Sequence, residues 1–140
     1  MARTDNFRKQ HDDLLAQATE ILNLTNRSEI NENVDTLRRL IARLAGKLKL
    51  HLAIEDDSLY PELYKQPDKE LQDTAMRFNK EMGGINTEFQ SYLDNWPISM
   101  AITNDPDNFI KETKSIFGVL AERINKENTV LYNMADKNLS

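Results

Sequence analysis

Apolar residues recur at alternating steps of three and four along four segments of the chain, and this spacing limits the possible folds more than any other feature. The clearest series is Leu71, Ala75, Phe78, Met82, Ile85 and Phe89. Such a period places the apolar side chains on one face of a helix. Pro67, Pro97 and Pro106 fall between the segments, where proline begins or ends helices. We therefore predict helices over residues 5–25, 30–65, 68–95 and 106–137.

Each predicted helix has one apolar face that must be buried against another helix. The short connections between the segments make neighbouring helices antiparallel. The expected fold class is therefore all-α, an up-down-up-down four-helix bundle. With a length of 140 residues, we expect one domain over residues 1–140.

Composition removes several classes of function. The formal net charge is −5 and no basic run is present, so we expect no nucleic-acid partner. Uninterrupted apolar stretches are only a few residues long, so we expect no membrane partner. The chain has no cysteine, which removes disulfides and thiolate metal sites. These features, with an N-terminus that lacks an apolar leader, are typical of a cytoplasmic protein.

Five polar residues occupy positions that belong to the apolar faces: His11, His51, Glu55, Arg123 and Glu127. Burying ionisable groups is costly unless they are paired or bind a metal. The distances of these residues from their helix ends, at about 1.5 Å per residue, place them near one level of an antiparallel bundle. The sequence therefore predicts a polar layer inside the core.

The chain also repeats itself. The pattern H-x-x-x-E-x-x-x-L-Y begins at His51, and R-x-x-x-E-x-x-x-L-Y begins at Arg123. His11 and His51 are 40 positions apart, while Met82 and Arg123 are 41 positions apart. Two helix pairs with the same internal layout indicate a pseudo-two-fold bundle, in which each half contributes equivalent positions to the polar layer.

These residues resemble a known family. A histidine on the first helix and H-x-x-x-E on the second, repeated on the third and fourth, is the pattern of hemerythrin-like (HHE cation-binding) domains. The resemblance covers essentially the whole chain, and residues 51–61 are especially similar to the second helix of that family. It implies a non-haem di-iron site in the bundle core, used for oxygen binding, sensing or iron handling.

The chain departs from the family at two positions, because Met82 and Arg123 stand where the family has histidines. The resemblance implies that the remaining ligands are His11, His51, Glu55 and Glu127, with both lost ligands belonging to the second metal. We therefore expect an incomplete, mononuclear metal site. We also expect Arg123 to replace the missing cation by pairing with Glu127, and Met82 to fill the remaining volume.

The expected cofactor is one non-haem iron, with zinc, manganese or no metal at all as alternatives. The expected function is sensing or handling of oxygen, nitric oxide or iron, with a small diatomic ligand as a partner. The alternative is a metal-free regulatory or interaction module, in which Arg123 neutralises the core glutamates and the partner is another protein or a second copy of the chain.

No catalytic residue stands out, since no nucleophile–base pair or phosphate-binding loop is present. The sequence thus favours a binding protein over an enzyme while leaving an iron oxidase or peroxide-handling enzyme open.

Three further residues near the predicted layer have plainer interpretations. Tyr60 and Tyr132 follow the two glutamates by five positions. We expect them to pack at the bundle end with their hydroxyls in water, the alternative being hydrogen-bond donors to the site. Glu81 adjoins Met82, and we expect it to point away from the layer.

Overall fold

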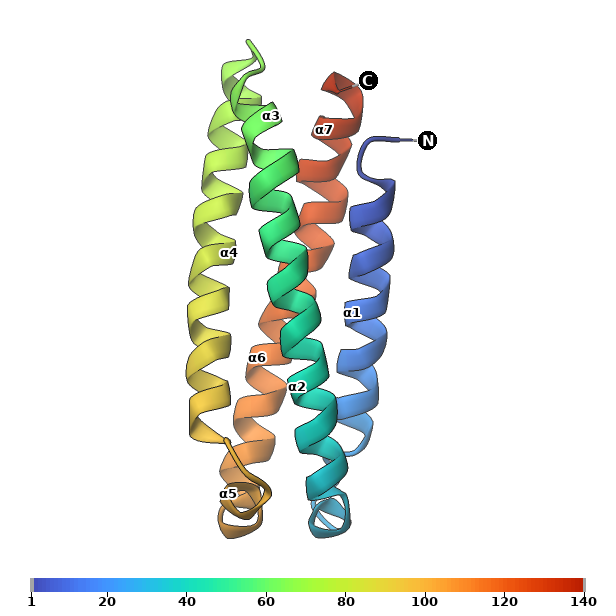
Figure 1. The fold of residues 1–140 in the computed structure, drawn as a ribbon, viewed down its shortest axis with the longest axis vertical. Helices are drawn as coiled ribbons and strands as arrows, with labels where there is room; N and C mark the ends of the chain where they lie inside the picture. Colours follow the sequence, from blue (N-terminus) through green and yellow to red (C-terminus); the bar gives the residue numbers. More distant parts are fainter. Residues whose placement is uncertain (1, 140) are drawn as a thin grey trace.

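The predicted four-helix bundle is present in the computed structural model, which describes residues 2–139. Met1 and Ser140, the ends of the expected domain, lie outside the described residues. The long helices are α1 (Asp5–Asn23), α2 (Ile30–Ile54), α4 (Lys69–Asn95) and α6 (Pro106–Lys126). Figure 1 shows them side by side, with the chain running up and down in turn. Their order confirms the predicted topology. The predicted helix ends agree within two residues when the continuations of α2 to Tyr64 and of α6 to Asn138 are included.

Two of these helices continue through a short π-helical turn. Helix α2 passes through η1 (Glu55–Leu59) into α3 (Tyr60–Tyr64), and α6 passes through η2 (Glu127–Leu131) into α7 (Tyr132–Asn138). In each turn the backbone N–H of the tyrosine donates to the carbonyl five residues earlier, at Glu55 and at Glu127. The two halves of the sequence repeat therefore share the same interruption at the same place.

The π-turns change which residues face the core. Each turn adds one residue to the helical repeat, so the residue five positions after the glutamate returns to the inner face. Leu131 and Tyr132 are consequently buried, whereas Val130, which the period places on the inner face, is 41% exposed. The alternating steps of three and four along residues 106–137 predict Val130 on the inner face, and this prediction is wrong because the π-turn interrupts the repeat of about 3.6 residues.

A short helix, α5 (Ser99–Asn104), was not predicted. It lies at the end of the bundle opposite the two termini, beside the connection from α1 to α2 (Figure 1). There Ile102 is buried, and α5 packs against α2 and α6. Trp96 ends α4 just before this segment, and its indole N–H donates to Glu112 Oε2 over 2.8 Å.

The core consists of two apolar clusters with a polar layer between them. One cluster fills the half of the bundle that contains Leu14, Leu48 and Phe117. The other includes Phe7, Leu59, Leu131 and Tyr132, near the termini. Met82 is buried, as predicted.

None of the helices described between residues 2 and 139 is both long and apolar enough to cross a lipid bilayer.

The π-turn at η2 predicts an asymmetry between two single-residue deletions. Deleting Val130 should convert the turn into ordinary α-helix and keep Leu131 and Tyr132 facing inward, so the protein should still unfold cooperatively. Deleting the exposed Glu122 in regular α6 should rotate the following residues by about 100° and destroy the core packing. Thermal unfolding followed by circular dichroism measures both. Equal loss of stability in the two variants would contradict this description of η2.

Candidate metal centre

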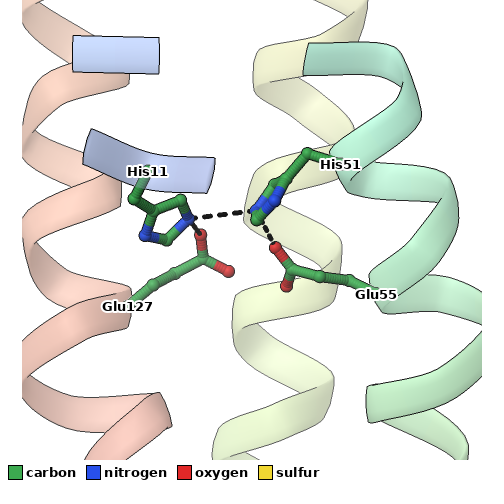
Figure 2. A group of neighbouring side chains, drawn as sticks. All are labelled: His11, His51, Glu55 and Glu127. Atoms are coloured by element: carbon green, nitrogen blue, oxygen red, sulfur yellow. Dashed lines mark hydrogen bonds and ion pairs between the residues drawn. The ribbon is translucent and has the colours of Figure 1, made fainter. Parts of the chain in front are cut away.

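The structure brings together the four residues that the sequence predicts as metal ligands. His11 comes from α1 and His51 from α2, while Glu55 and Glu127 are the first residues of the two π-turns. All four are at most 2% exposed, and one ligand atom from each lies within 4.8 Å of those of the others. Figure 2 shows the four side chains pointing toward one another.

The spacing of the donor atoms matches a shared metal ion. His11 Nε2 lies 3.0 Å from His51 Nε2 and 3.2 Å from Glu127 Oε1. Glu55 Oε1 contacts His51 Nε2. Metal–ligand bonds of about 2.1 Å at right angles place adjacent donors about 3 Å apart. The group can therefore hold one metal ion with little rearrangement.

Hydrogen bonds behind the histidines fix their tautomers. The amide oxygen of Asn128 lies 2.7 Å from His11 Nδ1, and that of Gln10 lies 2.5 Å from His51 Nδ1. Amide oxygens only accept, so each Nδ1 carries the proton and each Nε2 presents a lone pair. Two lone pairs that face each other at 3.0 Å repel unless a cation lies between them. This is the arrangement of histidines that ligate metals.

Sequence reasoning missed Gln10 and Asn128. Each is the chain neighbour of a predicted ligand, Gln10 of His11 and Asn128 of Glu127, and each supports a histidine on an adjacent helix. The available signal was an amide side chain directly beside His11 and directly beside Glu127.

The electrostatics of the site also favour a bound cation. Burial lowers the pKa of His11 below its usual value, so this imidazole is neutral at neutral pH. Burial, reinforced by the charge of Glu55, raises the pKa of Glu127 well above its usual range. Among residues 2–139, the buried Oε2 atom of Glu55 has no hydrogen-bond partner. Two buried carboxylates, one of which has an oxygen without a hydrogen-bond partner, are suited to binding a divalent ion.

The two tyrosines belong to this site, and the prediction that their hydroxyls lie in water is wrong. Tyr132 donates to Glu55 Oε1 over 3.0 Å, and Tyr60 donates to Glu127 Oε2 over 3.5 Å. Both side chains are buried. The π-turns are the cause, because they return the fifth residue after each glutamate to the inner face.

The prediction for Arg123 is also wrong. Its guanidinium forms an ion pair with Glu81 and lies 4.9 Å from the centre of the Phe78 ring. The Glu81 side chain is 42% exposed and that of Arg123 is 12% exposed, so the pair runs from the solvent-facing side of α4 toward the interior. Glu81 takes no part in the four-residue group, as predicted. The carboxylates of the layer therefore do not have Arg123 as their direct partner.

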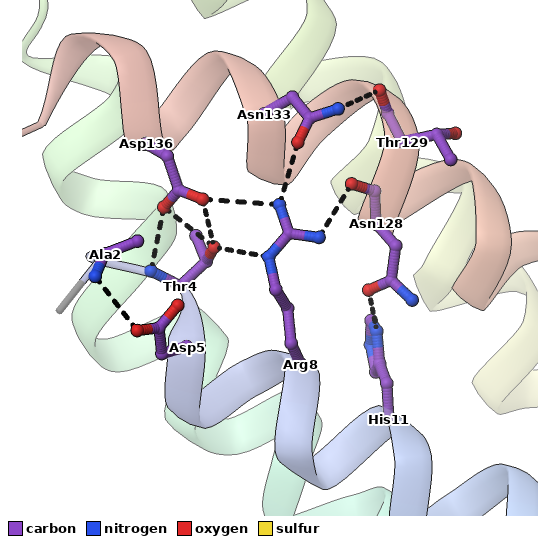
Figure 3. Close-up of polar contacts among 9 residues, drawn as sticks. All are labelled: Ala2, Thr4, Asp5, Arg8, His11, Asn128, Thr129, Asn133 and Asp136. Atoms are coloured by element: carbon purple, nitrogen blue, oxygen red, sulfur yellow. Dashed lines mark hydrogen bonds and ion pairs between the residues drawn. The ribbon is translucent and has the colours of Figure 1, made fainter.

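A second polar network anchors α1 to the helix that carries Glu127 (Figure 3). Arg8 donates to the backbone carbonyl of Asn128 and to the side chain of Asn133, each over 3.0 Å. Asp136 accepts hydrogen bonds from Thr4 and Arg8. The carbonyl of Asn128 lies in the π-turn, and the same residue holds His11. Arg8 thus fixes the turn that positions both Glu127 and His11.

A shallow cavity reaches the site from outside. It lies between α1 and α2, has a volume of about 200 Å³, and is lined by Gln10, Asp13, Leu14, Lys47, Leu50 and His51. Lys47 and Asp13 form an ion pair of 2.7 Å across it. His51 therefore belongs both to the lining of this cavity and to the candidate metal centre.

Comparison with known proteins agrees with the geometry. The family model for the hemerythrin HHE cation-binding domain matches residues 2–135, a span that includes all four candidate ligands. Searches of curated proteins and of solved structures gave no match. The match covers nearly the whole chain, and the fold and the buried His/Glu group are those that the sequence resemblance implied. The chain therefore belongs to the hemerythrin HHE cation-binding family.

Proposed function

We propose that this protein binds one metal ion through His11, His51, Glu55 and Glu127. The observation that carries the proposal is the pair of Nε2 lone pairs, which face each other at 3.0 Å while amide oxygens hold both Nδ1 protons. A cation relieves that repulsion and also neutralises the two buried carboxylates.

The site takes one metal because the second half lacks its ligands. Met82 supplies only a thioether, which is a poor ligand for a hard divalent ion. Arg123 adds a fixed positive charge, held by Glu81 and the Phe78 ring, that opposes a second cation. The guanidinium of Arg123 pairs directly with Glu81 and not with Glu55 or Glu127, so we favour the metal-bound form over the metal-free alternative, in which this arginine is the partner of the two glutamates.

Two imidazoles and two carboxylates suit non-haem iron, with zinc and manganese as competing ions. A mononuclear iron with free positions supplies a binding site for a small diatomic molecule. The role that we propose is therefore sensing or handling of oxygen, nitric oxide or iron, without catalysis. Within this chain, Gln10 and Asn128 orient the imidazoles, and Arg8 holds the π-turn.

The first test compares two neighbouring acidic residues. Protein loaded with Fe(II) without oxygen should retain about one equivalent after desalting, and Glu55→Gln should weaken binding by a factor of at least about ten. Asp56→Asn is the matched control, since Asp56 is exposed, and it should bind like the parent. Elemental analysis gives the stoichiometry. If Glu55→Gln retains as much iron as the parent protein, the assignment of Glu55 as a ligand is wrong.

A second test uses stability and pH. The folded-state pKa of Glu127 is raised, so folded protein binds more protons than unfolded protein, and its stability falls as pH rises above about 4.5. Glu127→Gln removes this penalty. Metal-free Glu127→Gln should therefore melt a few degrees above the metal-free parent at pH 8, with the difference shrinking toward pH 5. Added metal should raise the melting temperature of the parent and have little effect on the variant.

The control for this test is the exposed Glu88→Gln, which should leave both the pH dependence and the metal response unchanged. If metal-free Glu127→Gln is less stable than the parent at pH 8, Glu127 has a structural role that the metal hypothesis does not describe.

A third test restores the missing half of the site. The double variant Met82→His with Arg123→His replaces a thioether and a cation by two imidazoles at the positions that the sequence repeat pairs with His11 and His51. We expect the iron content to rise from about one to about two per chain. The single variant Met82→His should keep an iron content of about one per chain, because the positive charge of Arg123 remains. An unchanged content in the double variant would refute our explanation of the lost half.

A further inference from the structure

We infer that the phenol oxygen of Tyr132 is a fifth donor to the metal centre when the ion is ferric iron. This inference rests on the proposed function and adds to it a ligand of a different chemical class. The hydroxyl of Tyr132 lies 3.0 Å from Glu55 Oε1 and 3.2 Å from His11 Nε2. These separations equal those among the four proposed ligands, so the oxygen occupies the position of an adjacent donor around the same ion.

Packing holds the phenol oxygen in this place. Tyr132 is fully buried, and its ring stacks on that of His11 with centroids 5.1 Å apart and planes at 16°. Phe7 covers another part of the ring at 6.0 Å. The hydroxyl therefore needs only a small displacement to reach an ion bound by His11 and Glu55.

The π-turn is what makes this contact possible. In an unbroken α-helix, at about 100° per residue, the fifth residue after Glu127 would point about 140° away from it. In η2 the N–H of Tyr132 donates to the Glu127 carbonyl, and both side chains face the polar layer. A π-turn at such a position is common at functional sites.

Tyr60 occupies the equivalent position in the other half of the repeat but makes a poorer contact. Its hydroxyl lies 3.5 Å from Glu127 Oε2, and among the described residues it forms no hydrogen bond with either histidine. Tyr60 thus approaches only one of the proposed ligands, whereas Tyr132 approaches two. This difference makes Tyr60 the natural control.

Charge explains why ferric iron would recruit the phenol. Two carboxylates neutralise a divalent ion, and Tyr132 then remains a hydrogen-bond donor to Glu55. A ferric ion leaves one positive charge in a site that is almost fully buried, which is costly. When ferrous iron gives one electron to an added oxidant, the phenol O–H bond breaks, the proton passes to solvent, and an oxygen–iron bond forms. The site is again neutral.

The test uses the colour of ferric iron bound to a phenolate. The parent protein is loaded with Fe(II) without oxygen, oxidised with ferricyanide and desalted. We expect a visible charge-transfer band whose excitation enhances tyrosine ring vibrations in the resonance Raman spectrum. Tyr132→Phe should lose both signals, and Tyr60→Phe should keep them. Tyr132→Phe retains the ring that packs on His11 and Phe7, so we expect it to fold.

Iron content measured on the same samples separates the two hypotheses. A parent protein that retains no iron refutes the proposed function, and this inference with it. Retained iron without tyrosine vibrations refutes the inference alone, as does a band that survives in Tyr132→Phe or disappears in Tyr60→Phe. The Raman spectrum of the parent decides the question even if Tyr132→Phe does not fold.

Discussion

Two carboxylates and two imidazoles share a dry layer in the middle of a helical bundle, and the cost of burying them governs the rest of the structure. The apolar clusters on both sides exclude water from the layer. Arg123, the cation that the sequence places at the level of the layer, is paired with Glu81. A bound metal ion is then the simplest source of the missing positive charge. The surrounding amides, tyrosines and Arg8 are best understood as groups that hold this layer in place.

The two π-turns connect the sequence repeat to the chemistry of the site. Each begins at a glutamate of the layer and returns a tyrosine to the inner face. The repeat is preserved in the backbone even where the ligands have changed, because η2 follows Arg123 as η1 follows His51. The half that contains Met82 and Arg123 still has a glutamate, Glu127, at the start of its π-turn. This arrangement agrees with our proposal that a single metal ion is held by carboxylates from both halves.

Periodicity and antiparallel geometry were sufficient for the bundle and for a polar layer of five residues, and the resemblance to the family selected from these the four that converge. The sequence was insufficient where one added residue shifts the period, which is why Val130 was placed inside and the tyrosine hydroxyls outside. It also failed for Arg123, because spacing shows which face a long side chain leaves but not which partner it reaches. Glu81 and Phe78 lie on a neighbouring helix and compete for that guanidinium. Gln10 and Asn128 were missed for a similar reason, as each acts across a helix interface.

Anomalous diffraction from crystals of iron-loaded protein tests the central claim most directly, because it counts and locates the metal in one experiment. Our account predicts a single anomalous peak per chain, between His11 Nε2 and His51 Nε2 and within bonding distance of Glu55 and Glu127. A second peak beside Met82 and Arg123 would contradict the mononuclear site. A peak elsewhere, or none in crystals of protein that retains iron in solution, would show that this polar layer is not the metal centre.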